Sequence, residues 1–285
     1  MDPHASPPPA ERPLPAERPL PAEQPTPATR PTPPARPTWI VLPTYQEAAN
    51  VEGIATAILE QLPAATLLVV DDDSPDGTGR LADALAERDA RVRVLHRRAK
   101  QGLGRAYLAG FEVALRDGAG QVVQMDADWS HDPGYLPGLV AALDGADLVI
   151  GSRYVPGGGV VDWGLARRVI SRAGSLFARV VLGLPVHDLT GGFKAWRADL
   201  LTRLPRRGVH AGGYVFQIEM TYLADRLGAR IVERPIVFPD RRLGQSKMSR
   251  RIVAEALLVV LRLRWDELRG RGPLAAGPAS APDPR

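Results

Sequence analysis

The stretch Val122-Val123-Gln124-Met125-Asp126-Ala127-Asp128 joins a short apolar run to two aspartates that stand one residue apart. The apolar run predicts a buried strand over 122–125, so the aspartates would follow in the loop at its carboxyl end. Two carboxylates in such a loop are hard oxygen ligands, suited to Mg²⁺ or Mn²⁺ beside a diphosphate. Asp126 and Asp128 are therefore candidate metal ligands. An Asp-x-Asp triplet also arises by chance, so its meaning depends on the neighbouring loops.

On both sides of this stretch, short apolar runs alternate with amphipathic segments. Strands are expected at 39–42, 67–70, 92–95, 122–125 and 148–150, and helices at 51–62, 81–88, 104–115 and 133–143. This alternation predicts an α/β fold with a mostly parallel sheet and helices on both faces. In such a sheet the loops at the carboxyl ends of the strands share one edge, where ligands bind.

The regular alternation weakens after Gly151. Helices are expected at 163–182 and 214–227, a strand at 231–238, and a last amphipathic helix at 252–268. Residues 1–37 hold fourteen of the 28 prolines, in near-repeats such as AERPLP, which favours polyproline II or disorder. The predicted organisation is a disordered Pro-rich arm at 1–37, one α/β domain at 38–249, an amphipathic helix of the membrane-associating kind at 250–268, and a disordered tail at 269–285.

The composition narrows the classes of function. The chain of 285 residues has no cysteine, which excludes disulfides, thiolate catalysis and zinc–thiolate sites. No secretory signal is visible, and no run of about 18 apolar residues predicts a membrane-spanning helix, so a soluble or peripheral protein of the cytoplasm is expected. The net charge is +4 and the isoelectric point about 9.7. Basic side chains concentrate in the C-terminal half, which favours phosphate-bearing partners.

Two further loops carry polar residues at the same predicted edge of the sheet. PTYQE (43–47) follows the first strand, and DDDSPDGT (71–78) follows the second. Carboxylates at Glu47 and at Asp71 or Asp72 could accept hydrogen bonds from a base and a ribose, but the second loop could also form only a turn and a helix cap. The chain has neither GxGxxG after the first strand nor GxxxxGK[ST], which argues against dinucleotide-binding and P-loop folds.

Nine motifs in order resemble those of the family 2 glycosyltransferases, and among these the dolichol-phosphate or polyprenol-phosphate mannose synthases. They span roughly residues 39–250 and read PTYQE, VVDDDSPDGT, KQGLGRAY, QMDADWSHDP, GSRYVPGGG, RRVISR, DLTGGFKAW, GYVFQIEM and DRRLGQSKM. The resemblance implies a GT-A-like fold and an inverting enzyme that transfers mannose from GDP-mannose to a polyprenyl phosphate. It also implies Mg²⁺ or Mn²⁺ as cofactor, and a peripheral position on the cytoplasmic, inner face of a membrane.

The resemblance further assigns roles to residues of this chain. The nucleotide sugar would be bound by Pro43, Tyr45, Glu47, Asp71, Asp72, Asp126, Arg241 and Lys247. The metal would be bound by Asp126 and Asp128, and the acceptor phosphate by Arg153, Arg167 and Ser171. The predicted catalytic residues are Asp128, Arg153 and Arg167. The chain departs from the family pattern at Asp73, where many relatives have Gly, and at Ser130, where some have a metal-binding Gln. A water in place of the Ser130 side chain stays open as a metal ligand.

The chemistry of the implied reaction explains why these residue types are needed. Breaking a bond between a sugar and a diphosphate builds negative charge on the leaving group, and a divalent cation held by two carboxylates would neutralise it. A phosphate monoester is already anionic near neutral pH, so it can attack without a strong base. Arginines would bring the two anionic partners together, because guanidinium groups bind phosphate oxygens in pairs and keep their charge.

Two predicted helices combine basic and apolar side chains. Leu165, Val169, Leu176, Phe177 and Val180 lie on one face of the helix at 163–182, and Val253, Ala256, Leu257 and Val260 on one face of the last helix. Packing against the sheet is one interpretation, and a position in the lipid headgroup layer is the other. Other residues are interpreted as structural: Asp132 before Pro133 as a helix N-cap, and His131 and His187 as groups outside the chemistry.

Several alternatives remain at the level of sequence. A UDP-glucose:polyprenyl-phosphate glucosyltransferase would carry the same motifs. A non-catalytic module that binds anionic lipid would use the basic C-terminal half alone. A sugar nucleotidylyltransferase is disfavoured, because PTYQE stands where those enzymes have a glycine-rich basic loop. No nucleic-acid partner is expected, and a separate membrane protein that anchors the enzyme stays open as a partner.

Overall fold

The computed structural model describes residues 36–205, 209, 213–239 and 250–271 of the chain, and the side chains of residues 213, 214 and 250–253 are left out. The described residues all belong to one unit, Arg36–Arg285. Most of the predicted Pro-rich arm and tail lies outside the described residues. So do Arg241 and Lys247, which the sequence assigned to the nucleotide sugar.

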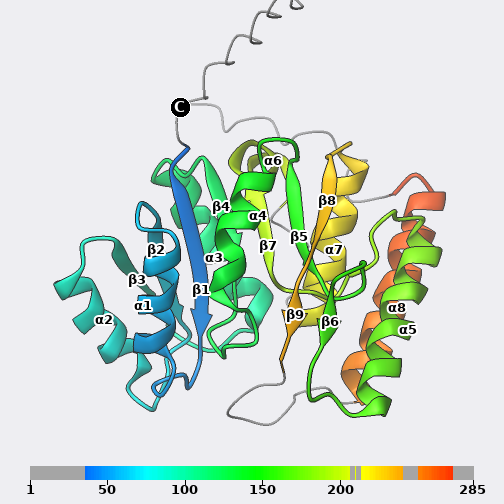
Figure 1. Cartoon of the computed structure of the whole chain (residues 1–285). Helices are drawn as coiled ribbons and strands as arrows, with labels where there is room; N and C mark the ends of the chain where they lie inside the picture. Colours follow the sequence, from blue (N-terminus) through cyan, green and yellow to red (C-terminus); the bar gives the residue numbers. More distant parts are fainter. Residues whose placement is uncertain (1–35, 206–208, 210–212, 240–249, 272–285) are drawn as a thin grey trace, which may run out of the picture. The chain divides into compact units, whose positions relative to one another are not determined.

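A seven-stranded sheet in the order β3-β2-β1-β4-β7-β5-β8 forms the centre of the described chain (Figure 1). The strands are β1 Thr38–Thr44, β2 Thr66–Asp71, β3 Val92–His96, β4 Gln121–Gln124, β5 Leu148–Ser152, β7 Lys194–Arg197 and β8 Ile231–Pro235. All neighbouring strands pair in parallel except β7, which runs antiparallel to both β4 and β5. A second, two-stranded sheet pairs β6 Gly159–Val160 with β9 Val237–Phe238. The predicted mostly parallel sheet is confirmed.

Helices cover both faces of the sheet, because each has an apolar stripe that must be buried. The helices are α1 Val51–Gln61, α2 Thr78–Arg88, α3 Leu103–Arg116, α4 Leu136–Ala142, α5 Leu165–Leu182, α6 Ala198–Arg203, α7 Gly213–Arg226 and α8 Arg250–Leu268. The apolar residues of α1, α2 and α4 join one core cluster with the sheet. Those of α3, α6 and α7 join a second cluster, to which α5 and α8 contribute from outside.

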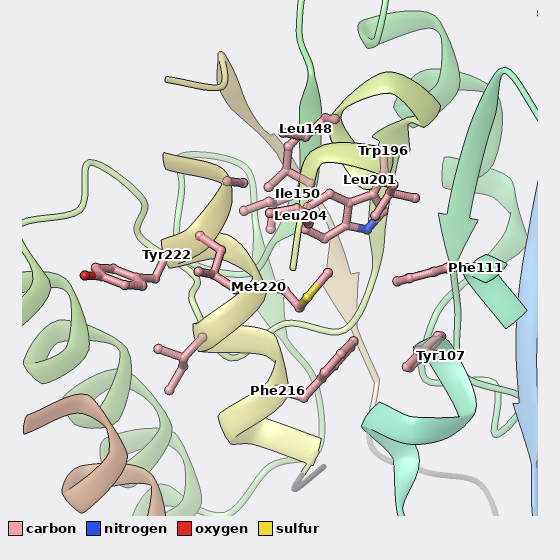
Figure 2. Packing of buried hydrophobic residues seen from close by; sticks show 14 of the residues in the cluster. Tyr107, Phe111, Leu148, Ile150, Trp196, Leu201, Leu204, Phe216, Met220 and Tyr222 are labelled. Carbon is pink, nitrogen blue, oxygen red and sulfur yellow. The ribbon is translucent and has the colours of Figure 1, made fainter. Parts of the chain in front are cut away.

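The second cluster fixes the distance between α3 and α7. The rings of Tyr107 and Phe216 stack with centroids 5.9 Å apart and an interplanar angle of 5°, and Figure 2 shows them facing each other across the gap between the two helices. A side chain on Gly104 would collide with Phe216, since a Cβ there would lie 2.9 Å from its ring atoms. Gly104, the second glycine of the motif KQGLGRAY, thus lets α7 approach α3. Both helices border the cavity described below.

Some elements differ from the prediction. The strand expected at 231–238 is divided at Ile236, whose N–H donates to the carbonyl of Ser152 (3.0 Å), so that β8 belongs to the main sheet and β9 to the small one. Pro235 has no N–H for a sheet ladder, which favours the break. The helix expected at 163–182 begins at Leu165, which leaves Trp163 in the preceding loop.

Other differences are a missed strand and a divided helix. β7 and α6 were not predicted, because Lys194-Ala195-Trp196-Arg197 mixes charged and apolar residues. The helix expected at 133–143 starts as a 3₁₀ turn before α4. The predicted cap is confirmed there, since the N–H of Gly134 donates to Oδ1 of Asp132 (2.8 Å).

α5 and α8 pack against each other at the edge of the fold (Figure 1). Each has an exposed row of apolar side chains. α5 buries small residues, Ser171, Ser175 and Ala178, together with Leu182. Its larger apolar side chains are exposed instead: Leu165, Val169, Ile170, Leu176 and Val180. α8 likewise exposes Leu257, Leu258, Leu261, Trp265 and Leu268. Packing of the predicted α5 face against the sheet is therefore wrong. No described helix is long and apolar enough to span a bilayer.

Candidate active site

A cavity of about 370 Å³ lies at the carboxyl edge of the parallel strands. The loops after β1, β2 and β4 reach it, and so does the loop before β7, because β7 runs in the opposite direction. Ten of the residues that line it are Pro43, Tyr45, Glu47, Asp72, Asp126, Asp128, Arg153, Arg167, Gly192 and Gln217. The structure thus brings together, around one cavity, most of the residues that the sequence assigned to a site.

The loop after β2 is braced by Asp71, which is not among the residues that line the cavity. Its carboxylate accepts hydrogen bonds from the hydroxyl of Thr44 (3.1 Å) and from the N–H and hydroxyl of Ser74 (3.1 and 2.6 Å). The neighbouring Asp72 does reach the cavity, where Arg97 donates a hydrogen bond to it. Burial raises the pKa of Asp72, although the positive charge of Arg97 opposes the shift. Of this predicted pair, only Asp72 lines the cavity.

The loop after β1 carries an aromatic platform. Tyr45 lines the cavity, and the ammonium of Lys100 lies 3.5 Å from the centre of its ring. A cation on an aromatic face is a favourable contact, and Lys100 itself lines the cavity. The sequence prediction missed Lys100, which begins the motif KQGLGRAY.

Asp126 is held from two sides. The hydroxyl of Tyr107 donates to its Oδ1 (2.7 Å), and its backbone N–H donates to Nδ1 of His131 (3.0 Å). Since Nδ1 accepts a hydrogen bond, the neutral imidazole carries its proton on Nε2. Burial and the nearby Asp126 raise the pKa of Tyr107 well above its ordinary value, so the phenol remains a donor. Neither Tyr107 nor His131 was among the predicted site residues.

Asp128 is fixed by its own loop. Ser130 donates to Oδ1 of Asp128 from both its hydroxyl (2.5 Å) and its N–H (3.1 Å). Between them Trp129 has a φ of 62°, a backbone conformation that is costly for a bulky residue. The loop thus contains one strained residue next to Asp128. Asp128 is only 6% exposed and lines the cavity.

The two carboxylates suit a hard divalent cation. In the described part of the chain no third acidic or histidine side chain joins them to complete a protein-only metal cage. Mg²⁺ is commonly bound by one or two carboxylates, with waters and substrate phosphates as the other ligands. Asp126 and Asp128 fit that mode. The hydroxyl of Ser130 is engaged by Asp128, which gives it a bracing contact within the loop.

Arg153 forms a buried ion pair below the cavity. Its Nε and Nη2 donate to the two oxygens of Asp188 (2.7 and 2.6 Å), and Nη2 also donates to the hydroxyl of Thr190 (2.8 Å). Burial alone would raise the pKa of Asp188, but the charge and hydrogen bonds of Arg153 prevail and lower it. The pair orients the guanidinium, which is 4% exposed and still lines the cavity.

Arg167 and Ser171 occupy different positions on α5. Arg167 lines the cavity, with its guanidinium 3.9 Å from the centre of the Trp163 ring. Ser171 is buried one turn further on, where its hydroxyl accepts a hydrogen bond from the hydroxyl of Tyr154 (2.6 Å), and it is not among the lining residues. The geometry thus brings two of the three residues predicted for the acceptor phosphate to the cavity.

The described chain has the architecture of a nucleotide-dependent transferase, with acidic strand-end loops, the buried Arg153 and the half-buried Arg167 around one cavity. Residues 39–204 match the model of glycosyl transferase family 2. The chain is 49% identical over 235 residues to undecaprenyl-phosphate mannosyltransferase of Micrococcus luteus, covering 81% of this chain and 97% of that protein. It is 47% identical over 237 residues to polyprenol monophosphomannose synthase of Mycolicibacterium smegmatis, covering 81% and 89%.

Solved structures agree on the fold. Glucosyl-3-phosphoglycerate synthase from Mycobacterium tuberculosis, in complex with Mn²⁺, uridine diphosphate and glucosyl-3-phosphoglycerate, is 25% identical with a TM-score of 0.56, covering 83% of this chain and 80% of that one. Its complex with phosphoglyceric acid is 24% identical with a TM-score of 0.60, covering 80% of each chain.

The chain therefore belongs to glycosyl transferase family 2 and is a glycosyltransferase. The resemblance to polyprenol-phosphate mannose synthases that its motifs predicted is confirmed by the two curated relatives, and the GT-A-like fold by the solved structures.

Proposed function

We propose that the protein transfers mannose from GDP-mannose to a polyprenyl phosphate, with inversion at the anomeric carbon and with Mg²⁺ or Mn²⁺ as cofactor. The observation that carries the proposal is that Asp126, Asp128, Arg153 and Arg167 line one cavity. Two carboxylates that could hold a metal ion and two guanidinium groups at a single cavity suit a reaction between two phosphate-bearing substrates. The names of both curated relatives favour mannose and a polyprenyl phosphate.

Each group of residues has a part in this reaction. Tyr45, Glu47 and Asp72 border the end of the cavity suited to the nucleoside. The cation held by Asp126 and Asp128 would stabilise negative charge on the departing diphosphate. Arg153 and Arg167 would hold the acceptor phosphate, which needs no strong base to act as nucleophile. Arg153 is already oriented by Asp188, so little freedom is lost when the phosphate binds.

The acceptor would reach the cavity from a membrane surface. α5 and α8 each contribute to the cavity lining, through Arg167 and Glu255. On their outer sides lie the exposed apolar stripes described above, with exposed arginines such as Arg168 and Arg172 among them. Apolar side chains flanked by arginines suit the headgroup layer of an anionic membrane. A peripheral position on the inner face of the membrane would place a lipid phosphate near the two cavity arginines.

A direct assay tests the proposal. Purified protein is incubated with Mg²⁺ or Mn²⁺, with vesicles containing a polyprenyl phosphate, and with each of several radiolabelled sugar nucleotides in turn. The expected result is a labelled lipid formed from GDP-mannose, which yields mannose after mild acid hydrolysis, and no labelled lipid once EDTA has removed the metal. Absence of any glycolipid with every donor would overturn the proposal.

The rival donor is UDP-glucose, because the solved structures with the same fold include complexes with uridine diphosphate. A thermal-shift titration with GDP and UDP in the presence of Mn²⁺ separates the two. The proposal predicts a larger stabilisation by GDP at equal concentration. A larger shift with UDP would favour the glucosyltransferase.

A further inference from the structure

Gln217 on α7 contributes a buried amide to the wall of the active-site cavity. Its side chain is only 2% exposed and belongs to the cavity lining. Among the residues that the structure describes, none makes a hydrogen bond to its Nε2. Buried polar groups almost always have a partner, so a donor left unpaired at the wall of a binding cavity indicates a ligand atom that accepts from it.

The orientation of this amide follows from a chain of hydrogen bonds that begins at an indole. Nε1 of Trp196 can only donate, and it donates to Oε1 of Gln124 (2.9 Å). Nε2 of Gln124 therefore faces the other way, where it donates to the carbonyl of Gly192 and to Oε1 of Gln217 (both 2.8 Å). Since Oε1 of Gln217 is the acceptor, its NH₂ group faces the cavity. Exchanging the two ends of the Gln217 amide would put two donors against each other.

The unpaired nitrogen lies beside the acidic side of the cavity. A Cβ built on Gly192 would be 3.4 Å from Nε2 of Gln217, 3.7 Å from Oδ2 of Asp126 and 3.3 Å from Cε1 of His131. These three groups thus surround the space above Gly192, where the missing side chain leaves room for a ligand. The place is next to the predicted metal and diphosphate, which is where a sugar attached to that diphosphate would lie.

The chemistry of the amide selects among ligand atoms. Arg153, Arg167 and Lys100 are charged donors that line the cavity, and their charge suits phosphate oxygens. An uncharged amide donor in a buried site suits an uncharged oxygen, such as a hydroxyl of a hexose. Buried polar groups that must find a partner also discriminate strongly, because a substrate that lacks the matching group leaves them unpaired.

We propose that Nε2 of Gln217 donates a hydrogen bond to one hydroxyl oxygen of the transferred hexose, which makes Gln217 a residue that determines sugar specificity. The inference rests on the proposed function only in that the cavity must accept a sugar nucleotide. Gln124 and Trp196 act through Gln217 as positioning residues.

The test compares the wild type with Gln217→Met and Gln217→Glu. Methionine keeps the length of the side chain and removes the amide, whereas glutamate keeps an acceptor for Gln124 but presents an oxygen to the cavity in place of N–H. Each protein is assayed with the sugar nucleotide that the wild type uses, and with the analogues in which single hydroxyls of the hexose are replaced by hydrogen. Affinity for the nucleoside diphosphate alone is measured by calorimetry.

The expected result has two parts. Both substitutions lower kcat/KM for the full substrate by about tenfold or more, while the affinity for the nucleoside diphosphate changes by less than about threefold. For one deoxy analogue, the wild type and Gln217→Met have the same kcat/KM, because that substrate lacks the hydroxyl that accepts the hydrogen bond. The loss caused by Gln217→Met persists with every other analogue.

A matched control comes from Thr221, one turn further along α7. Its hydroxyl accepts from Nζ of Lys194 (2.8 Å) and donates to the carbonyl of Gln217 (2.9 Å), but Thr221 is not among the cavity residues. Thr221→Val should lower thermal stability without changing the ranking of the deoxy analogues.

Equal losses with all analogues, or unchanged kcat/KM in the Gln217 variants, would overturn the inference while leaving the proposed function intact. A wild type that transfers no sugar from any donor would instead overturn the proposed function. If Gln217→Met does not fold, the same comparison with Gln217→Glu decides.

Discussion

At the scale of single residues, hydrogen bonds from neighbouring side chains orient both Asp126 and Asp128. Tyr107 holds one oxygen of Asp126 from α3, and Ser130 holds one oxygen of Asp128 from within the loop. Partners that orient a metal ligand commonly affect metal affinity about 10- to 100-fold when they are removed. If the aspartates bind a metal, removing these contacts should change the metal dependence of activity. If the aspartates were only structural, it should not.

Tyr107→Phe removes one hydroxyl and keeps the stacked ring. We expect the concentration of Mn²⁺ needed for half-maximal activity to rise about 10- to 100-fold, because the Asp126 carboxylate is no longer held. The metal dependence of the transferase assay measures this change. Tyr222→Phe is the control, since Tyr222 is a buried tyrosine of α7 that does not line the cavity. Equal metal dependence of the two variants would contradict the assignment.

Arg153→Lys tests the need for a guanidinium. Lysine keeps the positive charge but cannot make the paired hydrogen bonds to Asp188 that orient Arg153. We expect about a 10²- to 10³-fold loss of kcat, the usual effect of removing an oriented donor from an electrostatic site. Steady-state kinetics with saturating donor and acceptor measure the loss, and near-normal kcat would show that charge alone is enough at this position.

At the scale of secondary structure, α5 and α8 carry most of the large apolar side chains that are exposed in the described chain. Among the twelve large apolar residues that are exposed in the described chain, ten lie on these two helices. α5 buries mainly small residues and α8 buries Val259, Val260 and Leu263, while other large apolar side chains of both helices stay exposed. In the proposed function, these exposed side chains contact the membrane. The stripes are regular, as Leu165, Val169, Leu176 and Val180 recur at helical spacing.

Replacing Leu165, Val169, Leu176 and Val180 by Ser should weaken binding to vesicles that contain anionic lipid by at least about tenfold, because each buried apolar side chain contributes to partitioning. Cosedimentation with the vesicles measures the binding. Turnover of a short, water-soluble prenyl phosphate should be unchanged, which separates lost membrane contact from lost activity. Unchanged cosedimentation of the variant would contradict the membrane-facing assignment.

At the scale of the whole molecule, a lysine is buried in the centre of the sheet. Lys194 on β7 is fully buried, and Nζ donates to the carbonyl of Gln217 and the hydroxyl of Thr221 (both 2.8 Å). Burial lowers the pKa of Lys194 to about 7, although Asp188 opposes the shift. The unfolded chain keeps this proton up to the ordinary lysine pKa. The folded protein therefore binds fewer protons above pH 7, and this group makes stability rise with pH there.

Lys194→Met should remove that dependence. Urea unfolding at pH 7, 8 and 9 gives the free energy of unfolding of both proteins, and the wild type should gain stability relative to Lys194→Met as pH rises. Methionine is suited to the space because it is unbranched and apolar. Parallel pH profiles of the two proteins would mean that Lys194 is charged in the folded state throughout this range.

The parts that the sequence predicted correctly are those with local signals. Short apolar runs mark β1, β2 and β4, and Glu47, Asp72, Asp126 and Asp128 after them line one cavity because parallel strands end at one edge. β7 was missed because the buried Lys194 and the partly exposed Arg197 interrupt its apolar pattern. The orientation of Gln217 depends on Gln124, which is 93 positions away in sequence. Such a pairing has no local signal and appears only when β4, β7 and α7 are packed together.

In the proposed reaction, Asp126 and Asp128 hold a cation together with a nucleoside diphosphate. Calorimetric titration of GDP into the wild type and into Asp128→Asn, each with and without Mn²⁺, tests it most directly. We expect Mn²⁺ to strengthen GDP binding to the wild type by at least about tenfold, and we expect no such gain in Asp128→Asn. GDP binding that is equally strong with and without Mn²⁺ in the wild type would contradict it.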